Sequence, residues 1–411
     1  MPQTAPAEGK ASSAVDPRPG IAIISNSHTP YRLHLHQRIA KEVPEIKLWS
    51  LYTHETSNAP WNFDGEHDDI GAVMFGKGEN CDQQADLRRS LREWRRGGRI
   101  IRWIKQQNVK FVLMMGYNDA GRMRIIRWCH HNHLPCWVFG DSNILGDTAG
   151  GLKRSVKDRY VRRVVQWCDG VLSCGRLGAQ YFERYGADPQ HCFYFPYEPD
   201  YDLIHGLSDR EIQDTARHFS LDAQRRRIVF SGRLVEVKRL DLLLDAFAAI
   251  AGRRPEWDLL VIGDGPLRQE LQARLPLELA HRVRWTGFLD HQASVSALYR
   301  MCDVLVLPSD YEPWALVVNE AVAAGLAVVS SNVVGAAAEL VREGVNGRLF
   351  PPGDLRALME CLLDVTEAVN IDAMKSASAD MLADWRRRGD PVAGLRGALK
   401  QSGLISSQEP A

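Results

Sequence analysis

The sequence predicts an α/β protein built from two doubly wound halves, each a parallel sheet with helices on both faces. Three observations support this fold class. Short apolar runs alternate with segments of helical periodicity along most of the chain. Polar or glycine-containing loops follow the apolar runs, as they do at the carboxyl ends of parallel strands. The alternation stops in the proline-containing and then polar stretch 196–225, and it begins again afterwards.

Length and composition are those of an ordinary globular protein. The chain has 411 residues and a net charge of zero, which allows two or three domains with full cores. A neutral chain has no global field that would recruit nucleic acid, and it carries no nucleic-acid motif. The eight cysteines form no CxxC pair and no zinc spacing, so we expect reduced thiols in a cytoplasmic protein. No run approaches the ~18 apolar residues of a transmembrane helix.

The same alternation of predicted strands and helices, with the stretches that lack it, divides the chain into five parts. Residues 1–18 are rich in Pro, Ala and Ser without an apolar core, which predicts a disordered leader and not a signal peptide. We expect an N-terminal Rossmann-like domain at 19–205, a linker at 206–225 and a C-terminal Rossmann-like domain at 226–380. The remaining residues, 381–411, form a helical tail that could pack back on the N-terminal domain.

The N-terminal half alternates predicted strands and helices. We expect strands at 20–24, 46–51, 109–115, 135–139 and 170–173, and helices at 31–43, 121–132 and 176–185. Asn26, His28 and Arg32 follow the first strand, and Asp141 follows the fourth. Ligands of open α/β sheets bind at such strand ends, so these residues are cleft candidates. A lone aspartate such as Asp141 can equally cap the segment after it.

Two basic stretches interrupt this half. Residues 86–110 carry nine basic side chains against Asp86 and Glu93, and residues 152–165 carry six against Asp158. Leu91, Trp94, Ile101, Trp103 and Ile104 lie within the first stretch. One interpretation is a solvated helix face whose aromatic residues pack inward. The other is a peripheral contact with an anionic membrane surface through residues 86–110, on the inner face of the membrane.

The C-terminal half repeats the alternation. We expect strands at 227–231, 257–262, 283–286, 303–307, 327–330 and 348–350, and helices at 240–251, 267–275 and 294–301. Pro308 ends the strand at 303–307, and a helical pattern begins at Leu316. Glu312 therefore lies in a loop at a strand's carboxyl end, and Glu320 lies about one turn into a helix. Two carboxylates and the free N–H groups of a helix start should face one crevice.

These motifs together resemble those of family 4 glycosyltransferases, which are retaining and use nucleotide sugars. Gly232-Arg233 with Lys238, the run 261–266, Gly287-Phe288, the pair Glu312 and Glu320, and the stretch 339–347 occur in that family's order and spacing. The resemblance covers roughly 227–355. It implies the GT-B fold, in which two Rossmann-like domains face a central cleft. The donor would bind the C-terminal domain, and the N-terminal domain would select the acceptor.

The resemblance also implies roles for individual residues. Arg233 and Lys238 would clamp the donor diphosphate, because fixed cations stabilise the charge that develops on a departing nucleoside diphosphate. Their charge would replace a metal ion, so we expect no essential metal and no cofactor beyond the nucleotide-sugar co-substrate. Glu320 would bind the ribose hydroxyls, and Glu312 would face the donor hexose as a catalytic residue. Backbone N–H groups of Trp314, Ala315, Leu316 and Val317 would hold sugar and phosphate, and Gly287 and Phe288 would approach the base.

The sequence departs from the family in two loops. The loop from Ser25 to Arg32 has no glycine, so Asn26, His28 and Arg32 could serve the acceptor instead of the donor phosphate. Pro313 and Ala315 replace commoner glycines after Glu312, which stiffens that loop.

We therefore expect a metal-independent retaining hexosyltransferase that uses a nucleoside diphosphate sugar, with UDP favoured over GDP. Its acceptor would be a glycan or a lipid-linked glycan, in polysaccharide or glycolipid synthesis. One alternative is a GT-B nucleotide-sugar epimerase, and another is a non-catalytic scaffold that binds nucleotide sugars.

Overall fold

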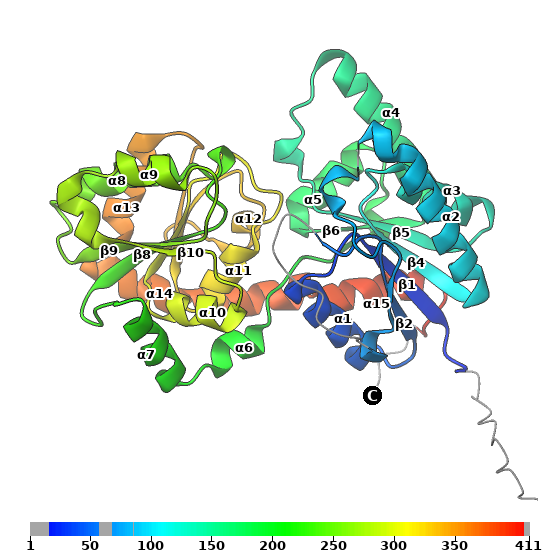
Figure 1. Ribbon diagram of the computed structural model, residues 1–411, viewed down its shortest axis with the longest axis horizontal. Helices are drawn as coiled ribbons and strands as arrows, with labels where there is room; N and C mark the ends of the chain where they lie inside the picture. Colours follow the sequence, from blue (N-terminus) through cyan, green and yellow to red (C-terminus); the bar gives the residue numbers. More distant parts are fainter. Residues whose placement is uncertain (1–15, 57–67, 85, 407–411) are drawn as a thin grey trace, which may run out of the picture.

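The computed structural model describes residues 16–56, 68–84 and 86–406, and it contains two parallel α/β sheets side by side (Figure 1). This confirms the predicted fold class. Most of the expected leader, residues 1–15, lies outside the described residues. Among the residues that are described, no helix combines the length and the apolar character needed to cross a bilayer.

The N-terminal sheet has seven strands in the order β3-β2-β1-β4-β5-β6-β7. Its strands are β1 (Gly20–Ser25), β2 (Lys47–Tyr52), β3 (Ala72–Met74), β4 (Val109–Met115), β5 (Cys136–Gly140), β6 (Gly170–Ser173) and β7 (Cys192–Tyr194). The helices between them are α1 (Pro30–Glu42), α2 (Ser90–Gln106), α3 (Ala120–His131), α4 (Gly151–Trp167) and α5 (Gly175–Arg184).

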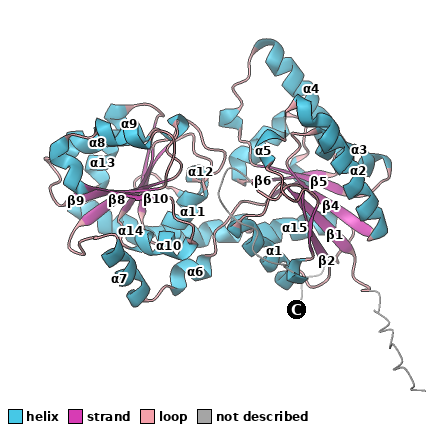
Figure 2. Ribbon diagram, viewed as in Figure 1, coloured by secondary structure: helices cyan, strands magenta, loops and turns pink. Residues whose placement is uncertain are grey.

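Alternation along β1 shows how the two faces of this sheet are covered. Ile21 and Ile23 pack into the cluster that contains α1, whereas Ala22 and Ile24 pack into the cluster that contains α2, α3 and α4. Successive side chains of a strand point to opposite faces, so a fully apolar strand needs helices on both. Figure 2 shows the magenta strands between these two helical layers.

The C-terminal sheet has six strands in the order β10-β9-β8-β11-β12-β13. Its strands are β8 (Arg226–Ser231), β9 (Trp257–Ile262), β10 (Val283–Gly287), β11 (Val304–Leu307), β12 (Ala327–Ser331) and β13 (Gly347–Phe350). The helices around it are α8 (Leu240–Ile250), α9 (Arg268–Arg274), α10 (Gln292–Arg300), α11 (Leu316–Ala323), α12 (Ala337–Leu340) and α13 (Leu355–Val365).

The chain passes between the two sheets twice. The first passage lies between β7 and α6 (Tyr201–Gly206), and α6 already packs on α10 and α11. The stretch 206–225, which we expected as a linker, contains α7 (Asp209–His218), and α7 also packs on α10. The return passage lies between α14 (Ala368–Gly389) and α15 (Pro391–Gln401), and α15 packs on α1, β6 and β7 of the N-terminal sheet.

Each sheet has one point where the strand order reverses. In the N-terminal sheet it lies between β1 and β4, and in the C-terminal sheet between β8 and β11. Loops on the two sides of such a reversal diverge, so a crevice opens at the carboxyl ends of the strands. The loops that follow these four strands contain Asn26, Arg233 and Glu312 among the predicted site residues.

Three of the five apolar residues named in 86–110 pack inward, as the first of the two interpretations expects, so they are not available to a membrane surface. Ile101 and Ile104 are buried in the core, and Trp103 packs edge-on against Trp49 at 5.2 Å between ring centroids. The other two, Leu91 and Trp94, are exposed, and the Arg124 guanidinium covers the Trp94 ring at 4.7 Å. The helical period of α2 explains this, because residues at i, i+3 and i+7 share the face that packs on α3.

Candidate active site

The C-terminal switch point brings Lys238 and Glu312 together. Lys238 ends the short 3-10 helix η6 (Glu236–Lys238) after β8, and its ammonium group forms an ion pair with Glu312 in the loop after β11. The Ser309 hydroxyl also donates to Glu312, at 2.9 Å. Glu312 is buried and Lys238 is partly buried. A charge pair with little water around it is held in place more firmly than one on the surface.

Further contacts fix these two loops against each other. The backbone N–H of Asp310 donates to the Val237 carbonyl at 2.9 Å, and Arg239 pairs with the Asp310 carboxylate at 3.0 Å. The Lys238–Glu312 ion pair thus lies between two loops that are also connected by a backbone hydrogen bond and a second ion pair.

Arg233 lies in the same loop as Lys238 but is differently placed. It is exposed, and within the described chain its guanidinium forms no hydrogen bond or ion pair. An uncommitted cation two residues after a strand end remains available to an incoming anion.

Glu320 is buried in α11 behind this pair. Its two carboxylate oxygens accept from the Gln292 amide at 2.9 Å and from the Tyr299 hydroxyl at 3.2 Å, both from α10. Burial raises the pKa of Glu320 to about 7, although both hydrogen bonds act in the opposite direction. The sequence pattern did not indicate Gln292 or Tyr299, because their contact with Glu320 depends on how α10 packs against α11.

The start of α11 adds unused donors. The backbone N–H groups of Leu316 and Val317 donate no hydrogen bond within the described chain, as is usual in a first helical turn. Ala315 precedes them with φ of 79°, in the left-handed region that favours glycine. The Trp314 side chain is buried, and its indole N–H donates to the Tyr197 carbonyl at 3.0 Å. Because this side chain is already engaged, only the backbone N–H of Trp314 could serve the predicted role of holding sugar or phosphate oxygens.

Two glycines bring the neighbouring loops close to this site. Gly287 ends β10 with φ of 77°, and its carbonyl accepts from the Gly263 N–H at 2.9 Å. A Cβ on Gly263 would lie 2.0 Å from the Gly232 carbonyl oxygen, so a side chain there would displace the loop that carries Arg233. Phe288 follows Gly287 and is exposed.

A cavity of about 430 Å³ lies at the N-terminal switch point. Residues after β1, β4 and β5 form its floor, and α4 and α5 contribute to its wall. Among its lining residues are Asn26, Arg32, Arg122, Asp141, Lys157 and the tyrosines Tyr117, Tyr160, Tyr181 and Tyr197. Such a mixture of hydroxyls, aromatic rings and a few charges suits a sugar-like ligand.

The structure brings three of the four predicted N-terminal residues into this cavity. Arg32 is buried and donates to Asn26 Oδ1 at 2.6 Å and to the Ser27 carbonyl at 2.7 Å. Asp141 remains accessible to water, and desolvation by the cavity walls raises its pKa. His28 is buried beside Tyr52, with 5.8 Å between ring centroids, and does not line the cavity.

The two switch points are connected by contacts across the domain boundary. The Asn143 side-chain amide, two residues after Asp141, donates to the backbone carbonyls of Glu312 and Pro313 at 3.1 and 3.2 Å. The Arg176 N–H in α5 donates to the Glu339 carboxylate at 2.8 Å. The loop that carries Glu312 is therefore positioned from both domains.

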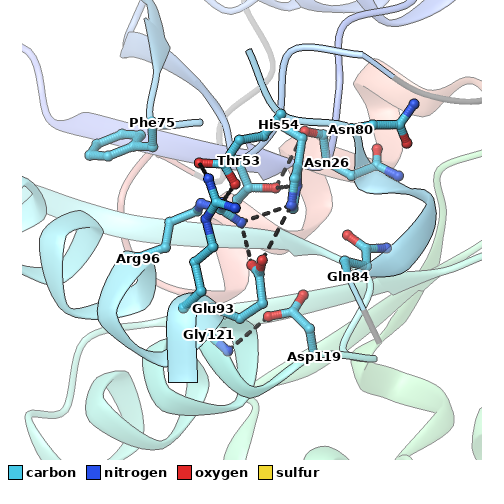
Figure 3. A network of polar contacts seen from close by, with 12 residues as sticks. Asn26, Thr53, His54, Phe75, Asn80, Gln84, Glu93, Arg96, Asp119 and Gly121 are labelled. Carbon is cyan, nitrogen blue, oxygen red and sulfur yellow. Dashed lines mark hydrogen bonds and ion pairs between the residues drawn. The ribbon is translucent and has the colours of Figure 1, made fainter. Parts of the chain in front are cut away.

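A buried network of polar contacts joins α2 to the segment after β2 (Figure 3). Arg96 of α2, one of the nine basic residues of 86–110, is buried and pairs with Glu93 and Glu79. It also donates to His54 Nε2 at 2.8 Å. The spacing of His54, Glu79 and Glu93 could hold a metal ion. Since the Arg96 guanidinium already contacts all three, we assign the cluster a structural role.

Comparisons with known proteins agree with this arrangement. Residues 225–368 match the family model described as "Glycosyl transferases group 1". A mannosylfructose-phosphate synthase of Agrobacterium fabrum is 26% identical over 304 residues, which is 68% of this chain and 66% of that protein. An exopolysaccharide phosphotransferase of Streptomyces coelicolor is 36% identical over 137 residues, or 33% of this chain and 14% of that protein. This chain therefore spans less than two thirds of these curated relatives.

Solved structures are similar over nearly the whole chain. Anabaena HepE in complex with UDP and glucose has a TM-score of 0.69 at 19% identity, covering 94% of this chain and 100% of that one. Sucrose-phosphate synthase from Thermosynechococcus elongatus has a TM-score of 0.72 at 16% identity, covering 95% and 100%. Identities this low establish the fold alone. The chain thus has the GT-B fold, and its residues 225–368 are similar to the group 1 glycosyltransferases.

Proposed function

We propose that this protein is a retaining hexosyltransferase that takes its sugar from a nucleoside diphosphate donor. The observation that carries the proposal is the Lys238–Glu312 pair with Arg233 beside it, at the switch point between β8 and β11. A departing diphosphate gains negative charge as its bond to the sugar breaks. Two cations held at that position stabilise the transition state more than the ground state, which accelerates the reaction.

The roles of the carboxylates follow from their surroundings. Glu312, with its charge balanced by Lys238, would accept hydroxyl donors of the hexose and stabilise positive charge on the sugar ring. Glu320, oriented by Gln292 and Tyr299, would accept the ribose hydroxyls. The free N–H groups of Leu316 and Val317 would meet donor oxygens.

The donor is proposed to be a UDP-hexose. Support comes from HepE, a protein of the same fold whose structures contain UDP, glucose and UDP-glucose. The acceptor would be a glycan or a lipid-linked glycan bound in the N-terminal cavity, where Asp141 and the tyrosines offer hydrogen-bond partners for hydroxyl groups.

The test is to incubate the protein with UDP- and GDP-hexoses, with and without candidate acceptor extracts, and to measure nucleoside diphosphate release. Transfer predicts release that depends on acceptor. An epimerase would convert the nucleotide sugar into a second nucleotide sugar, and a scaffold would bind it without turnover. Either of those results would contradict the proposal.

We further propose that the reaction needs no metal ion, because Arg233 and Lys238 already neutralise the diphosphate. Activity should then persist in excess chelator. Loss of activity in chelator that magnesium or manganese restores would refute this part and would leave the transfer reaction standing.

A further inference from the structure

Helix α4 exposes apolar side chains in an unusual position. Leu152 is 82% exposed and Val156 is 64% exposed, one helical turn apart on the same face. In α4 only Val161 and Val164 are buried, and both lie in its second half. The first half of the helix extends beyond the rest of the N-terminal domain (Figure 1). No described part of the chain covers these two side chains.

The surface around this helix is basic, and it is assembled by the fold. Helix α2 packs on α3, and α3 packs on α4, so the two basic stretches that lie 41 residues apart at their nearest ends share one layer. The exposed cations of this layer that form no ion pair within the described chain include Arg95, Arg99, Arg102 and Lys105 of α2, Arg127 of α3, and Lys153, Arg159, Arg162 and Arg163 of α4.

Most outer cations of this layer have no counter-charge within the described chain, although Arg92 pairs with Glu79. Arg96 points inward and pairs with Glu79 and Glu93, and Arg154 and Lys157 share the Asp147 carboxylate. The outer cations keep their charge for a partner outside the chain. A groove on α2 and α3 is lined by Arg95, Arg99, Arg102, Lys105 and Arg124 without a carboxylate.

We propose that this layer, residues 90–106, 120–131 and 151–167, docks on an anionic lipid bilayer with Leu152 and Val156 inserted among the headgroups. A broad basic surface with a protruding apolar end fits a bilayer, which supplies phosphate charge over a wide area and an apolar interior just beneath it. A protein partner would have to match three helices at once.

The docked orientation has a consequence at the acceptor cavity. Lys157, Tyr160 and Val161 line that cavity and follow Leu152 and Val156 in the same helix, α4. Insertion of the helix end would hold the cavity beside the membrane, where a lipid-linked acceptor is presented. This consequence rests on the proposed transferase function, whereas the docking itself does not.

The experiment is co-sedimentation of the full chain with vesicles of phosphatidylcholine alone or mixed with phosphatidylglycerol, at low salt and at 1 M salt. We expect binding only to the anionic vesicles, and weakening in 1 M salt, where the screening length falls to ~3 Å. The double variant Leu152→Ser/Val156→Ser should reduce the partition coefficient by about tenfold or more. Replacing Arg95, Arg99 and Arg102 with Ser should remove the preference for anionic lipid.

The chain offers a matched control. Leu277 and Val369 are 91% and 80% exposed on the C-terminal domain, so Leu277→Ser/Val369→Ser removes the same residue types, with at least as much exposure, outside the layer. This variant should bind vesicles like the unmodified protein. Equal loss in both double variants, or no binding by the unmodified protein at low salt, would overturn the proposal. So would a dimer that dissociates in Leu152→Ser/Val156→Ser without any vesicle binding, because a second copy would then cover the helix.

Nucleotide affinity measured on the same samples separates this inference from the proposed function. Vesicle binding without UDP or GDP binding would contradict the transferase and leave the docking surface intact. Nucleotide binding without vesicle binding would contradict the docking surface and leave the proposed transferase function standing.

Discussion

The two switch points carry comparable charges but arrange them differently. At the C-terminal one, Lys238 is paired with Glu312, and Arg233 is exposed. At the N-terminal one, buried Arg32 has neutral hydrogen-bond partners such as Asn26 and the Ser27 carbonyl, and tyrosines line the same cavity. The first arrangement suits a ligand of fixed chemistry, a diphosphate. The second offers many weak contacts, as an acceptor site of variable chemistry requires.

The largest expected effect is on the diphosphate clamp. Lys238→Ala and Arg233→Ala should each reduce turnover by roughly a hundredfold or more. The two variants should differ in folding stability. Lys238→Ala leaves buried Glu312 without its cation, which should lower the free energy of unfolding by about 1–3 kcal/mol. Arg233→Ala breaks no ion pair within the described residues and should leave stability unchanged. Steady-state rates and thermal unfolding of both variants test this.

Near-normal turnover in both variants would remove the clamp from the mechanism. Arg356→Ala, which changes an exposed arginine of α13 far along the chain, serves as the control for the loss of one charge.

The second prediction concerns the separate roles proposed for Glu312 and Glu320. Glu320→Ala should weaken nucleoside diphosphate binding by about tenfold or more, since a charge-assisted contact to the ribose is lost. Glu312→Ala should keep that affinity nearly unchanged while turnover falls. Calorimetric titration with UDP or GDP measures both, and an equal loss of affinity in the two variants would contradict the division.

The third prediction concerns pH. Burial raises the pKa of Glu320 from its ordinary 4.5 to about 7, so the folded protein holds this proton below neutral pH. The contribution of this proton to folding stability is present below about pH 4.5 and is lost as pH rises through 7. The proposed contact of Glu320 with the ribose needs the ionised form, so nucleotide affinity should change with pH in the opposite direction. From pH 8 to pH 6, affinity for a UDP-hexose should fall roughly tenfold.

A UDP-hexose is the right probe because its diphosphate has no proton to lose near neutral pH. Glu320→Gln should make the affinity independent of pH in this range. A profile in Glu320→Gln that matches the unmodified protein would assign the titration to another group.

The fourth prediction tests the N-terminal cavity alone. Asp141→Asn and Tyr160→Phe should each raise the acceptor KM by roughly two- to tenfold, the loss of one hydrogen bond. Donor affinity should not change, because both residues belong to the opposite domain. A parallel loss of donor affinity would mean that the two switch points bind one ligand jointly.

The smallest effect is expected at the loop that precedes α11. Ala315 has φ of 79°, which costs an alanine about 1–2 kcal/mol, so Ala315→Gly should stabilise the protein by up to about 1 kcal/mol in chemical unfolding. Ala324→Gly is the matched control, since Ala324 ends the same helix with φ of −77° and should lose stability instead. Destabilisation by Ala315→Gly would show that the loop relies on the alanine methyl group.

Several features followed from the sequence by itself. The alternation of apolar runs and helices predicted both sheets, because a strand buried on two faces must be continuously apolar. Most residues predicted for the donor site follow β8, β10 and β11 within short loops, so their places could be predicted from local sequence, while their roles stay predictions. The geometry of a short loop can be predicted from sequence because it depends on a few neighbouring residues.

Other features depended on packing between distant elements. Ile101 and Arg96 are buried because of how α2 packs in the fold. Gln292 and Tyr299 hydrogen-bond to Glu320, and Asn143 hydrogen-bonds to the loop that carries Glu312. These contacts join residues that are far apart in the chain. The basic layer and the exposure of Leu152 and Val156 arise in the same way, from the packing of α2, α3 and α4. Composition shows that these cations and apolar side chains exist. Only the tertiary structure decides which of them pair inside and which remain for a partner, because burial and counter-charge are properties of neighbours in space.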